Sequence, residues 1–387
     1  MRFPEFSGEW EMVSLQDIAT INPKSDPLQN TFIYIDLEAV EKGELRKIQE
    51  IMREEAPSRA QRVIDNNDIL FQCVRPYQKN NYIHRILNTS NQQWVASTGY
   101  AQIRTTELPN YIYHLLNTDE FNRKVMVRCT GSSYPAINSE DLATIHLYYT
   151  PDKKEQLKIS RLLDLLDKRI ATQNKIIEDL KKLKSAISKH LFARKDLLET
   201  TICLSNIATL KNGYAFQSGM YNALGKWKIL TISNVSGERY INDKDCNCII
   251  KLPNDIQDHQ VLKEGDILIS LTGNVGRVSL CKDGDYLLNQ RVGLLQLAKN
   301  VNQEFLYQIL SSQRFENSMI ACGQGAAQMN IGKGDVESYV LPYSSNVNNI
   351  LLVAKILHSY DEYIINEQRK LTLLTMQKQY FLAQMFI

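Results

Sequence analysis

The side chains with the clearest chemical potential lie in four polar loops, at 73–82, 130–142, 270–277 and 323–336. These loops carry arginine, lysine, amide, hydroxyl and aromatic side chains, which are the types that contact base edges and phosphates. A solvated turn would explain any one of these side chains, but two related sets at corresponding loops predict a nucleic-acid-binding surface. The predicted DNA contacts are Arg75, Tyr77, Lys79, Asn80, Ser97, Thr98, Ser132, Ser133, Tyr134, Tyr214, Thr272, Asn274, Arg277, Arg291, Gln324, Gln328 and Asn330.

Catalytic motifs are not found. The sequence has no GxxxxGK[ST], no HExxH and no GxSxG, and the six histidines are scattered. A methyltransferase would need a Gly-rich cofactor loop and an Asn/Asp-Pro-Pro-aromatic element, and neither is present. The segment PDKKE at 151–155 lacks the second carboxylate element of a nuclease, and Cys246 and Cys248 have poor spacing for zinc. We therefore expect no catalytic residue, no metal and no cofactor bound by this chain.

Two long helices must position the loops. The segment Glu155–Phe192 contains no Pro or Gly, and its apolar residues recur at steps of four and three, interrupted at Gln173 and Lys184. The apolar positions are Ile159, Leu163, Leu166, Ile170, Ile177, Leu180, Ile187 and Leu191. Asn349–Phe386, 194 residues later, has the same pattern with breaks at Glu367 and Lys378. These shared breaks predict that the two helices pack on each other and that buried polar groups set their register.

The same offset extends into the rest of the chain. WVASTGYAQI (94–103) aligns with LNQRVGLLQL (288–297), whereas NNDIL (66–70) answers EGDIL (264–268) and LQDIATI (15–21) answers LSNIATL (204–210) with small shifts. The chain is thus two copies of a globular domain followed by a long helix. We predict an α+β protein in which two similar mixed α/β domains are separated by two long antiparallel helices that form an intramolecular coiled coil. The predicted boundaries are 1–151, 152–195, 196–348 and 349–387.

Each copy contains a short initial helix, several strands, a further helix and a last strand. The short helices are expected at Leu15–Ala19 and Leu204–Ala208, and the further helices at Tyr111–Leu116 and Phe305–Leu310, ending near Phe121 and Phe315. β-Branched and aromatic residues predict strands at Phe32–Ile35, Ile69–Cys73, Trp94–Ala96, Ala101–Arg104, Ile229–Ile232, Ile267–Leu271, Val278–Leu280 and Gly293–Leu297. The last strands are expected at Thr144–Tyr148 and Ser338–Leu341.

Charge is concentrated in one element. The whole chain has a formal net charge of +2, but residues 152–195 hold 13 Lys/Arg against 6 Asp/Glu, so the first long helix is basic. That composition alone does not identify a nucleic-acid binder, because a solvated basic helix face looks the same. The sequence has no apolar run of membrane-spanning length and no signal core in MRFPEFSGEW, so we expect a cytoplasmic protein without membrane contact.

The sequence resembles the specificity subunits of type I restriction-modification systems over essentially its whole length. RFPEFSGEWE (2–11) is similar to the family's opening phrase, and APSRAQRVIDNNDILFQCVRP (56–76) and VASTGYAQIR (95–104) resemble the core of its target-recognition domains. GYAFQSGMYN (213–222) with ILTISNV (229–235) resembles the start of another such domain. The first domain departs from this opening, with NPKSDPLQNTFIYIDL at 22–37.

The resemblance implies a non-catalytic subunit in which each domain reads one half of a bipartite double-stranded DNA target. The helix pair would set the spacer and dock two methyltransferase subunits, which would bind S-adenosylmethionine, and an endonuclease/translocase subunit would join them. The extra apolar residues Ile176, Leu183 and Leu373 would belong to that docking face. A stand-alone DNA-modifying enzyme and a protein-binding scaffold are the alternative hypotheses.

Overall fold

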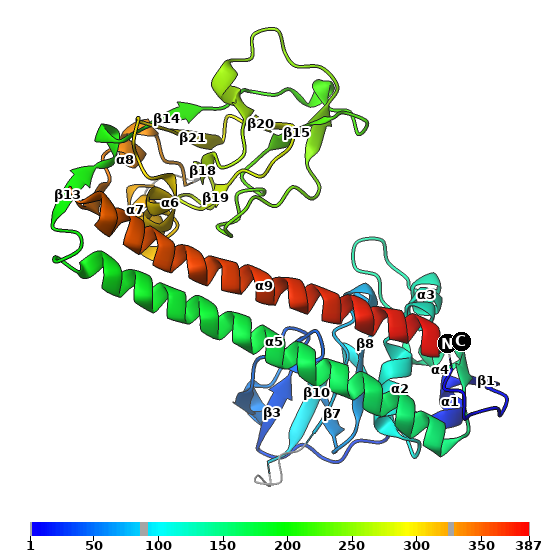
Figure 1. Ribbon diagram of the computed structural model, residues 1–387. Coiled ribbons are helices and arrows are strands. Elements are labelled where there is room, and N and C mark those ends of the chain that lie inside the picture. Colours follow the sequence, from blue (N-terminus) through cyan, green and yellow to red (C-terminus); the bar gives the residue numbers. More distant parts are fainter. Residues whose placement is uncertain (1, 86–91, 324–328, 387) are drawn as a thin grey trace. The chain divides into compact units, whose positions relative to one another are not determined.

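The computed structural model describes residues 2–85, 92–323 and 329–386 (Figure 1). The chain forms two compact units. Unit 1 consists of Met1–Asn174 and Lys370–Ile387, and unit 2 of Lys175–Arg369. The long helices α5 (Lys153–Ala193) and α9 (Val347–Met385) each contribute one part to each unit. The units are described separately below.

Unit 1 contains two four-stranded sheets with the strand orders β6-β3-β10-β7 and β2-β11-β8-β9. The strands are β2 (Thr20–Ile21), β3 (Thr31–Ile35), β6 (Gln49–Met52), β7 (Ala60–Ile64), β8 (Ile69–Gln72), β9 (Tyr82–Ile83), β10 (Trp94–Ser97) and β11 (Tyr100–Arg104). β1 (Glu11–Ser14) pairs with β12 (His146–Tyr149), and β4 (Val40–Glu41) pairs with β5 (Glu44–Leu45). The pair β10·β3 is parallel, and the other pairs are antiparallel.

Unit 2 repeats the two four-stranded sheets and the β1·β12 pair of unit 1, and within its described residues β4·β5 has no counterpart. Its sheets have the orders β16-β15-β20-β17 and β14-β21-β18-β19, and β13 pairs with β22. The strands are β13 (Thr200–Cys203), β14 (Ala208–Asn212), β15 (Trp227–Leu230), β16 (Asn247–Ile249), β17 (Val261–Leu262), β18 (Ile267–Ser270), β19 (Val278–Leu280), β20 (Tyr286–Leu288), β21 (Val292–Leu297) and β22 (Val340–Tyr343). The single parallel pair, β15·β20, corresponds to β10·β3. The predicted internal repeat is therefore confirmed.

One part of the predicted alignment is wrong by two residues. The ungapped offset equates Gly99 with Gly293, but Tyr100 pairs with Gln72 while Val292 pairs with Ser270, so Gly99 corresponds to Arg291. Successive side chains in a strand alternate between faces, so a shift of two residues keeps every side chain on its own face. The apolar pattern alone could not detect the shift.

The helices after the sheets follow the 194-residue offset. Unit 1 has α1 (Leu15–Ile18), α2 (Pro109–Leu116), α3 (Asp119–Arg128) and α4 (Ser139–Ala143), and unit 2 has α6 (Gln303–Leu310), α7 (Gln313–Cys322) and α8 (Lys333–Glu337). The short helix predicted at Leu204–Ala208 is a 3-10 helix that spans Leu204–Asn206. The prediction of one helix ending near Phe121 is wrong, because the hydroxyl of Thr118 accepts a hydrogen bond from the Phe121 N–H and caps a second helix. Ser312 does the same for Phe315.

The long helices have nearly the predicted bounds and begin after capping side chains. Asp152 accepts hydrogen bonds from the N–H groups of Lys154 and Glu155, and Asn346 accepts one from Asn348 at the start of α9. Figure 1 shows both as long, uninterrupted helices.

The parts of α5 and α9 within each unit pack antiparallel to each other. In unit 1 the early α5 residues Ile159 and Leu163 share a core with the late α9 residues Leu382 and Met385. In unit 2 the late residue Leu191 shares a core with Ile350, Val353, Ala354 and Leu357 from the start of α9. Both cores also include residues of the sheets and of α2 or α6, so each globular domain is anchored on its own helix segments.

Two of the four predicted polar breaks, Lys184 and Lys378, form ion pairs within the units. Lys378 donates to Asp167 at 2.5 Å in unit 1, and Lys184 donates to Asp361 at 2.6 Å in unit 2. The two residue numbers have the same sum in both pairs, as antiparallel helices in a single register require. The repeat offset converts one pair into the other, which confirms that polar groups mark the register.

Candidate nucleic-acid interface

In unit 1 the 73–82 loop is held against the 130–137 loop by backbone hydrogen bonds. Cys73 N–H donates to Gly99 O at 3.0 Å, and Ile137 N–H donates to Cys73 O at 3.1 Å. Arg75 N–H donates to Pro135 O at 2.8 Å. Burial raises the pKa of the Cys73 thiol to about 12, so this side chain is a neutral core residue beneath the loop.

Arg75 and Tyr134, both predicted DNA contacts, form a cation–π pair in unit 1. The guanidinium carbon of Arg75 lies 4.3 Å from the centroid of the Tyr134 ring, and that ring is 62% exposed. Arg75 and Lys79 both adopt left-handed backbone conformations, with φ of 56° and 53°, and they flank a 3-10 turn that exposes Tyr77. This arrangement presents a flat cation and two aromatic rings, which suits contacts to bases and phosphates.

The other predicted contacts of unit 1 differ in accessibility. Lys79 donates to Asp119 at 2.5 Å, and the Asn80 carbonyl oxygen accepts from Lys42 N–H, so both side chains also stabilise the loop. Ser97 is only 3% exposed, and its hydroxyl accepts a hydrogen bond from Gly99 N–H. Thr98 is half-buried, and Ser132 and Ser133 are exposed.

Sequence reasoning missed Arg59 as a candidate contact. Its carbonyl accepts a hydrogen bond from Thr98 N–H at 2.9 Å, which places it beside the predicted edge. Its side chain is exposed and makes no ion pair with any residue that the structure describes. The sequence signal for Arg59 is its position in APSRAQR (56–62), a segment that resembles the core of a target-recognition domain.

In unit 2 four predicted contacts lie along one linked edge. Thr272 and Asn330 form a β-bridge, and Leu271 N–H donates to Arg291 O at 3.0 Å. Tyr214 bridges Asn289 in parallel, and its carbonyl accepts from Gln290 N–H. The structure therefore brings together Tyr214, Thr272, Arg291 and Asn330.

Gly213 permits this edge to close. A Cβ atom there would lie 2.2 Å from the carbonyl oxygen of Asn289, closer than any side chain can approach. The GYAF segment therefore needs a glycine because two backbones touch at this point.

The remaining predicted contacts of unit 2 are partly engaged. The Tyr214 hydroxyl donates to Asp255 at 2.8 Å, and this hydrogen bond raises the pKa of the phenol. Arg277 lies 3.5 Å from a carboxylate oxygen of Glu316, and Asn274 is exposed. Gln324 and Gln328 lie outside the described residues.

The aspartate shared by NNDIL and EGDIL has a structural role in both copies. Asp68 accepts a hydrogen bond from Asp65 N–H, and Asp266 accepts one from Lys263 N–H, which closes the same turn before β8 and β18. Asp68 also binds Arg104 through two hydrogen bonds and Gln102 through one. These residues hold the strand that leads into the recognition loop.

Metal ligands and membrane-spanning helices were searched for within residues 2–85, 92–323 and 329–386. Those residues contain no group of three or more His, Cys, Asp or Glu side chains that could hold a metal ion. In the same ranges, the helices lack the combination of length and apolar character that crossing a bilayer requires.

A model of the type I restriction modification DNA specificity domain matches the chain twice, over residues 7–182 and 199–376. The chain belongs to this family. The two matches fall on the two copies of the repeat, so each copy is a DNA specificity domain with its following helix.

Curated relatives and solved structures agree with this assignment. The MjaVIII specificity subunit of Methanocaldococcus jannaschii is 27% identical over 233 residues, which cover 54% of this chain and 53% of the relative. The HindI specificity subunit of Haemophilus influenzae is 24% identical over 195 residues, covering 49% and 39%. The chain thus spans about half, or less, of the length of these relatives.

Two solved structures match nearly the whole chain. A type I restriction-modification S subunit from M. genitalium has a TM-score of 0.59 at 15% identity, covering 98% of this chain and 96% of that one. A chain from a study of the assembly of a type I restriction-modification system also has a TM-score of 0.59, at 20% identity, with 97% of both chains covered. These likenesses support the fold of the specificity-domain family.

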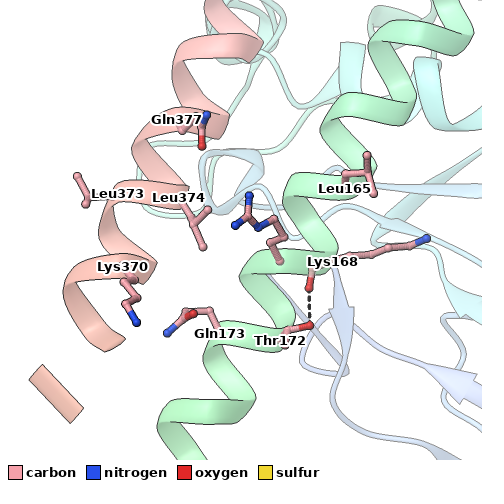
Figure 2. A pocket seen from close by; sticks show the side chains of 9 residues that line it. Leu165, Lys168, Thr172, Gln173, Lys370, Leu373, Leu374 and Gln377 are labelled. Carbon is pink, nitrogen blue, oxygen red and sulfur yellow. Dashed lines mark hydrogen bonds between the residues drawn. The ribbon is translucent and has the colours of Figure 1, made fainter. Parts of the chain in front are cut away.

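Unit 1 also carries a groove between α5 and α9, with a volume of about 640 Å³ (Figure 2). Leu165 from α5 and Leu373 and Leu374 from α9 line it, and Figure 2 shows them on the two helices that form its walls. Leu165 and Leu373 are 53% and 66% exposed. The charged lining residues are Lys168, Arg169 and Lys370, so the groove is apolar with a basic rim and is a candidate surface for a partner protein.

Proposed function

We propose that this chain is the DNA sequence-specificity subunit of a type I restriction-modification complex and has no catalytic residues of its own. Each domain reads one half of a bipartite duplex target, unit 1 through the edge at Arg75 and Tyr134 and unit 2 through the edge at Tyr214 and Arg291. The observation that carries this proposal is the duplication of a matched DNA specificity domain, each copy with its own polar loop edge.

The helix pair acts as the spacer and as the docking surface. A helix of 41 residues is about 60 Å long at 1.5 Å per residue, which equals about 18 base pairs at 3.4 Å per pair. Exposed apolar residues of α5 and α9, including Ile176, Leu183 and Leu373, would contact two methyltransferase subunits. S-adenosylmethionine would bind to those subunits, and the endonuclease/translocase subunit would join the complex in the cytoplasm.

Sequencing that detects methylated bases in the host genome tests the function directly. The expected result is one motif of two short blocks around unread base pairs, lost when this chain is deleted. A motif that is continuous, or that persists without the chain, would refute the proposal. Turnover of S-adenosylmethionine by the purified chain alone would instead identify a stand-alone enzyme.

A helix-length variant tests the spacer. Inserting four residues next to Asn174, with a matching insertion next to Gln368, should change the preferred spacer and leave both half-sites unchanged. Altered half-sites with an unchanged spacer would show that helix length does not set the distance.

A further inference from the structure

A second groove lies entirely within unit 2, between the globular domain and the adjoining segments of α5 and α9. Its volume is about 1300 Å³. Its lining includes six basic residues and three acidic ones, a surplus of three positive charges. The basic residues are Lys181, Lys184, Lys189, Arg239, Lys282 and Arg314, and the acidic residues are Glu238, Glu316 and Asp361.

The charges divide into a neutralised floor and an unpaired rim. On the floor, Asp361 accepts from Lys184 at 2.6 Å and from Arg239 at 2.9 Å; Asp361 and Arg239 are buried, and Lys184 is partly buried. On the rim, Lys189 and Arg314 are exposed and form no ion pair with any residue in the described ranges. Lys181 pairs with Glu238 at 2.7 Å and Lys282 with Asp243 at 3.1 Å, so the charges available to an anionic partner are those of Lys189 and Arg314.

The groove is continuous with the predicted recognition surface. Arg277 lies 3.5 Å from Glu316, which lines the groove. The Arg277 side chain also passes 3.7 Å from where a Cβ of Gly237 would lie, and Gly237 lines the groove as well. An anion bound along the rim would therefore lie next to a residue predicted to contact DNA.

The two copies of the repeat differ at this rim. The 194-residue offset equates Lys181 and Lys189 with Thr375 and Ala383, and Arg314 with Glu120. The unpaired cations Lys189 and Arg314 thus correspond to an alanine and a glutamate in unit 1, whereas the groove residues Asn317 and Ser318 correspond to Arg123 and Lys124, so positive charge is placed differently in the two copies. Two copies of one partner subunit would need like surfaces on both units, whereas two different DNA half-sites need different ones. The asymmetry favours DNA over a docked subunit.

We propose that the rim of this groove binds the phosphate backbone of DNA beside the half-site that unit 2 reads. The inference rests on the proposed function and adds a sequence-independent contact to it. The ammonium of Lys189 contacts a phosphate as a point charge, and the guanidinium of Arg314 can donate two hydrogen bonds to one phosphate. The loops at Tyr214 and Arg291 make the contacts that depend on the base sequence.

The test is the double variant Lys189→Gln/Arg314→Gln, in the full chain assembled with its methyltransferase subunits. Binding of target and random duplexes is measured across a range of salt concentrations. The slope of log K against log salt is negative, and each lost phosphate contact makes it shallower by about 0.9. The double variant should therefore reduce the magnitude of the slope by about 2. Affinity should fall by the same factor for both duplexes, and the half-site preference should not change.

Lys182→Gln is the matched control, because Lys182 is exposed on the same helix, pairs with Glu178 and does not line the groove. It should leave the slope unchanged. An unaltered slope in the double variant overturns the inference, as does loss of methyltransferase subunits in sedimentation, which would make the groove a protein-docking site. If the wild-type complex shows no preference for a bipartite target, it is the proposed function that fails.

Discussion

Removing the negative charge of Asp361 is the sharpest test of how unit 2 is held together. This carboxylate is 6% exposed and accepts hydrogen bonds from Lys184 at 2.6 Å, Arg239 at 2.9 Å and Gln308 at 2.6 Å. Lys184 extends from α5, Asp361 from α9, and Arg239 and Gln308 from the globular domain. Asp361→Asn keeps the shape of the side chain but removes a carboxylate side chain that is 8% exposed and leaves the partly buried Lys184 ammonium without its partner.

The expected loss can be worked out from the burial of the partners. Breaking a buried ion pair by removing one member costs about 3–5 kcal/mol, because the remaining charge stays desolvated. Arg239 keeps Glu304, whose pKa is pushed up by burial but is lowered on balance by hydrogen bonds from Arg239 and Gln308. Only the Lys184 ammonium loses its sole carboxylate in this network, so we expect about 3 kcal/mol, the lower end of the range.

The repeat provides an internal control. Asp167 is the counterpart of Asp361 and pairs with Lys378, but the two side chains are 36% and 21% exposed. Exposed pairs contribute about 0.2–1 kcal/mol, so Asp167→Asn should cost about 1 kcal/mol or less.

Hydrogen exchange of the full chain in increasing urea reports the free energy of unfolding separately for peptides of residues 175–369 and of 1–174. Asp361→Asn should destabilise the first group, and adding Lys184→Met should restore part of the loss by removing the unpaired cation. Equal effects of Asp361→Asn and Asp167→Asn, or no recovery on adding Lys184→Met, would refute the reasoning from burial.

Three further variants test individual features. Burial lowers the pKa of His84 to about 4, so the unfolded chain binds more protons than the folded chain between about pH 6.5 and 4. The free energy of unfolding of unit 1 should therefore fall by about 3 kcal/mol as the pH falls through that window. His84→Phe should abolish this loss, which urea titrations at each pH would measure. Gly213→Ala should destabilise the unit 2 edge by about 2 kcal/mol through its clash with Asn289, and a half-site binding assay should show lost affinity for one block only. Tyr134→Ala should weaken binding of the other block by about 0.5–1 kcal/mol because Arg75 loses its ring, whereas full affinity in this variant would exclude that role.

The pairing of the two long helices and the duplication of the domain were predictable because both leave periodic patterns in the sequence. A heptad pattern with two polar breaks fixes helix type, helix length and register together, and the structure has the Lys–Asp pairs that such breaks require. The repeat predicted that both copies share one topology. The strand register after β10 was not predictable in the same way, since moving it by two residues preserves every apolar face.

The site was predictable as a set of loops and less so as individual side chains. The loops around Arg75 and Arg291 do lie at linked edges of their own domains. Ser97 lies in the interior because it is the last residue of β10, and sequence polarity does not reveal whether a hydroxyl points to solvent or to a neighbouring N–H. Arg59 reaches the same edge from the turn that immediately precedes β7, a strand that was not predicted.

A contact between a histidine and a carboxylate connects each globular domain to its long helix in both copies. In unit 1, Nε2 of the fully buried His114 on α2 lies 2.8 Å from a carboxylate oxygen of Asp164 on α5, and only the ring can donate to an ionised carboxylate. In unit 2 the offset puts Gln308 and His358 at these positions, and the histidine on α9 now faces Glu304 on α6 at 3.6 Å.

The acid and the histidine have exchanged helices, yet a polar link between the globular domain and the long helix is present in both copies. A domain that could turn on its helix would not present its loop edge at a fixed place along the DNA. The retained link, with different residues on each side, is what the proposed reading of two separated half-sites requires, and it leaves the loops free to differ between the copies.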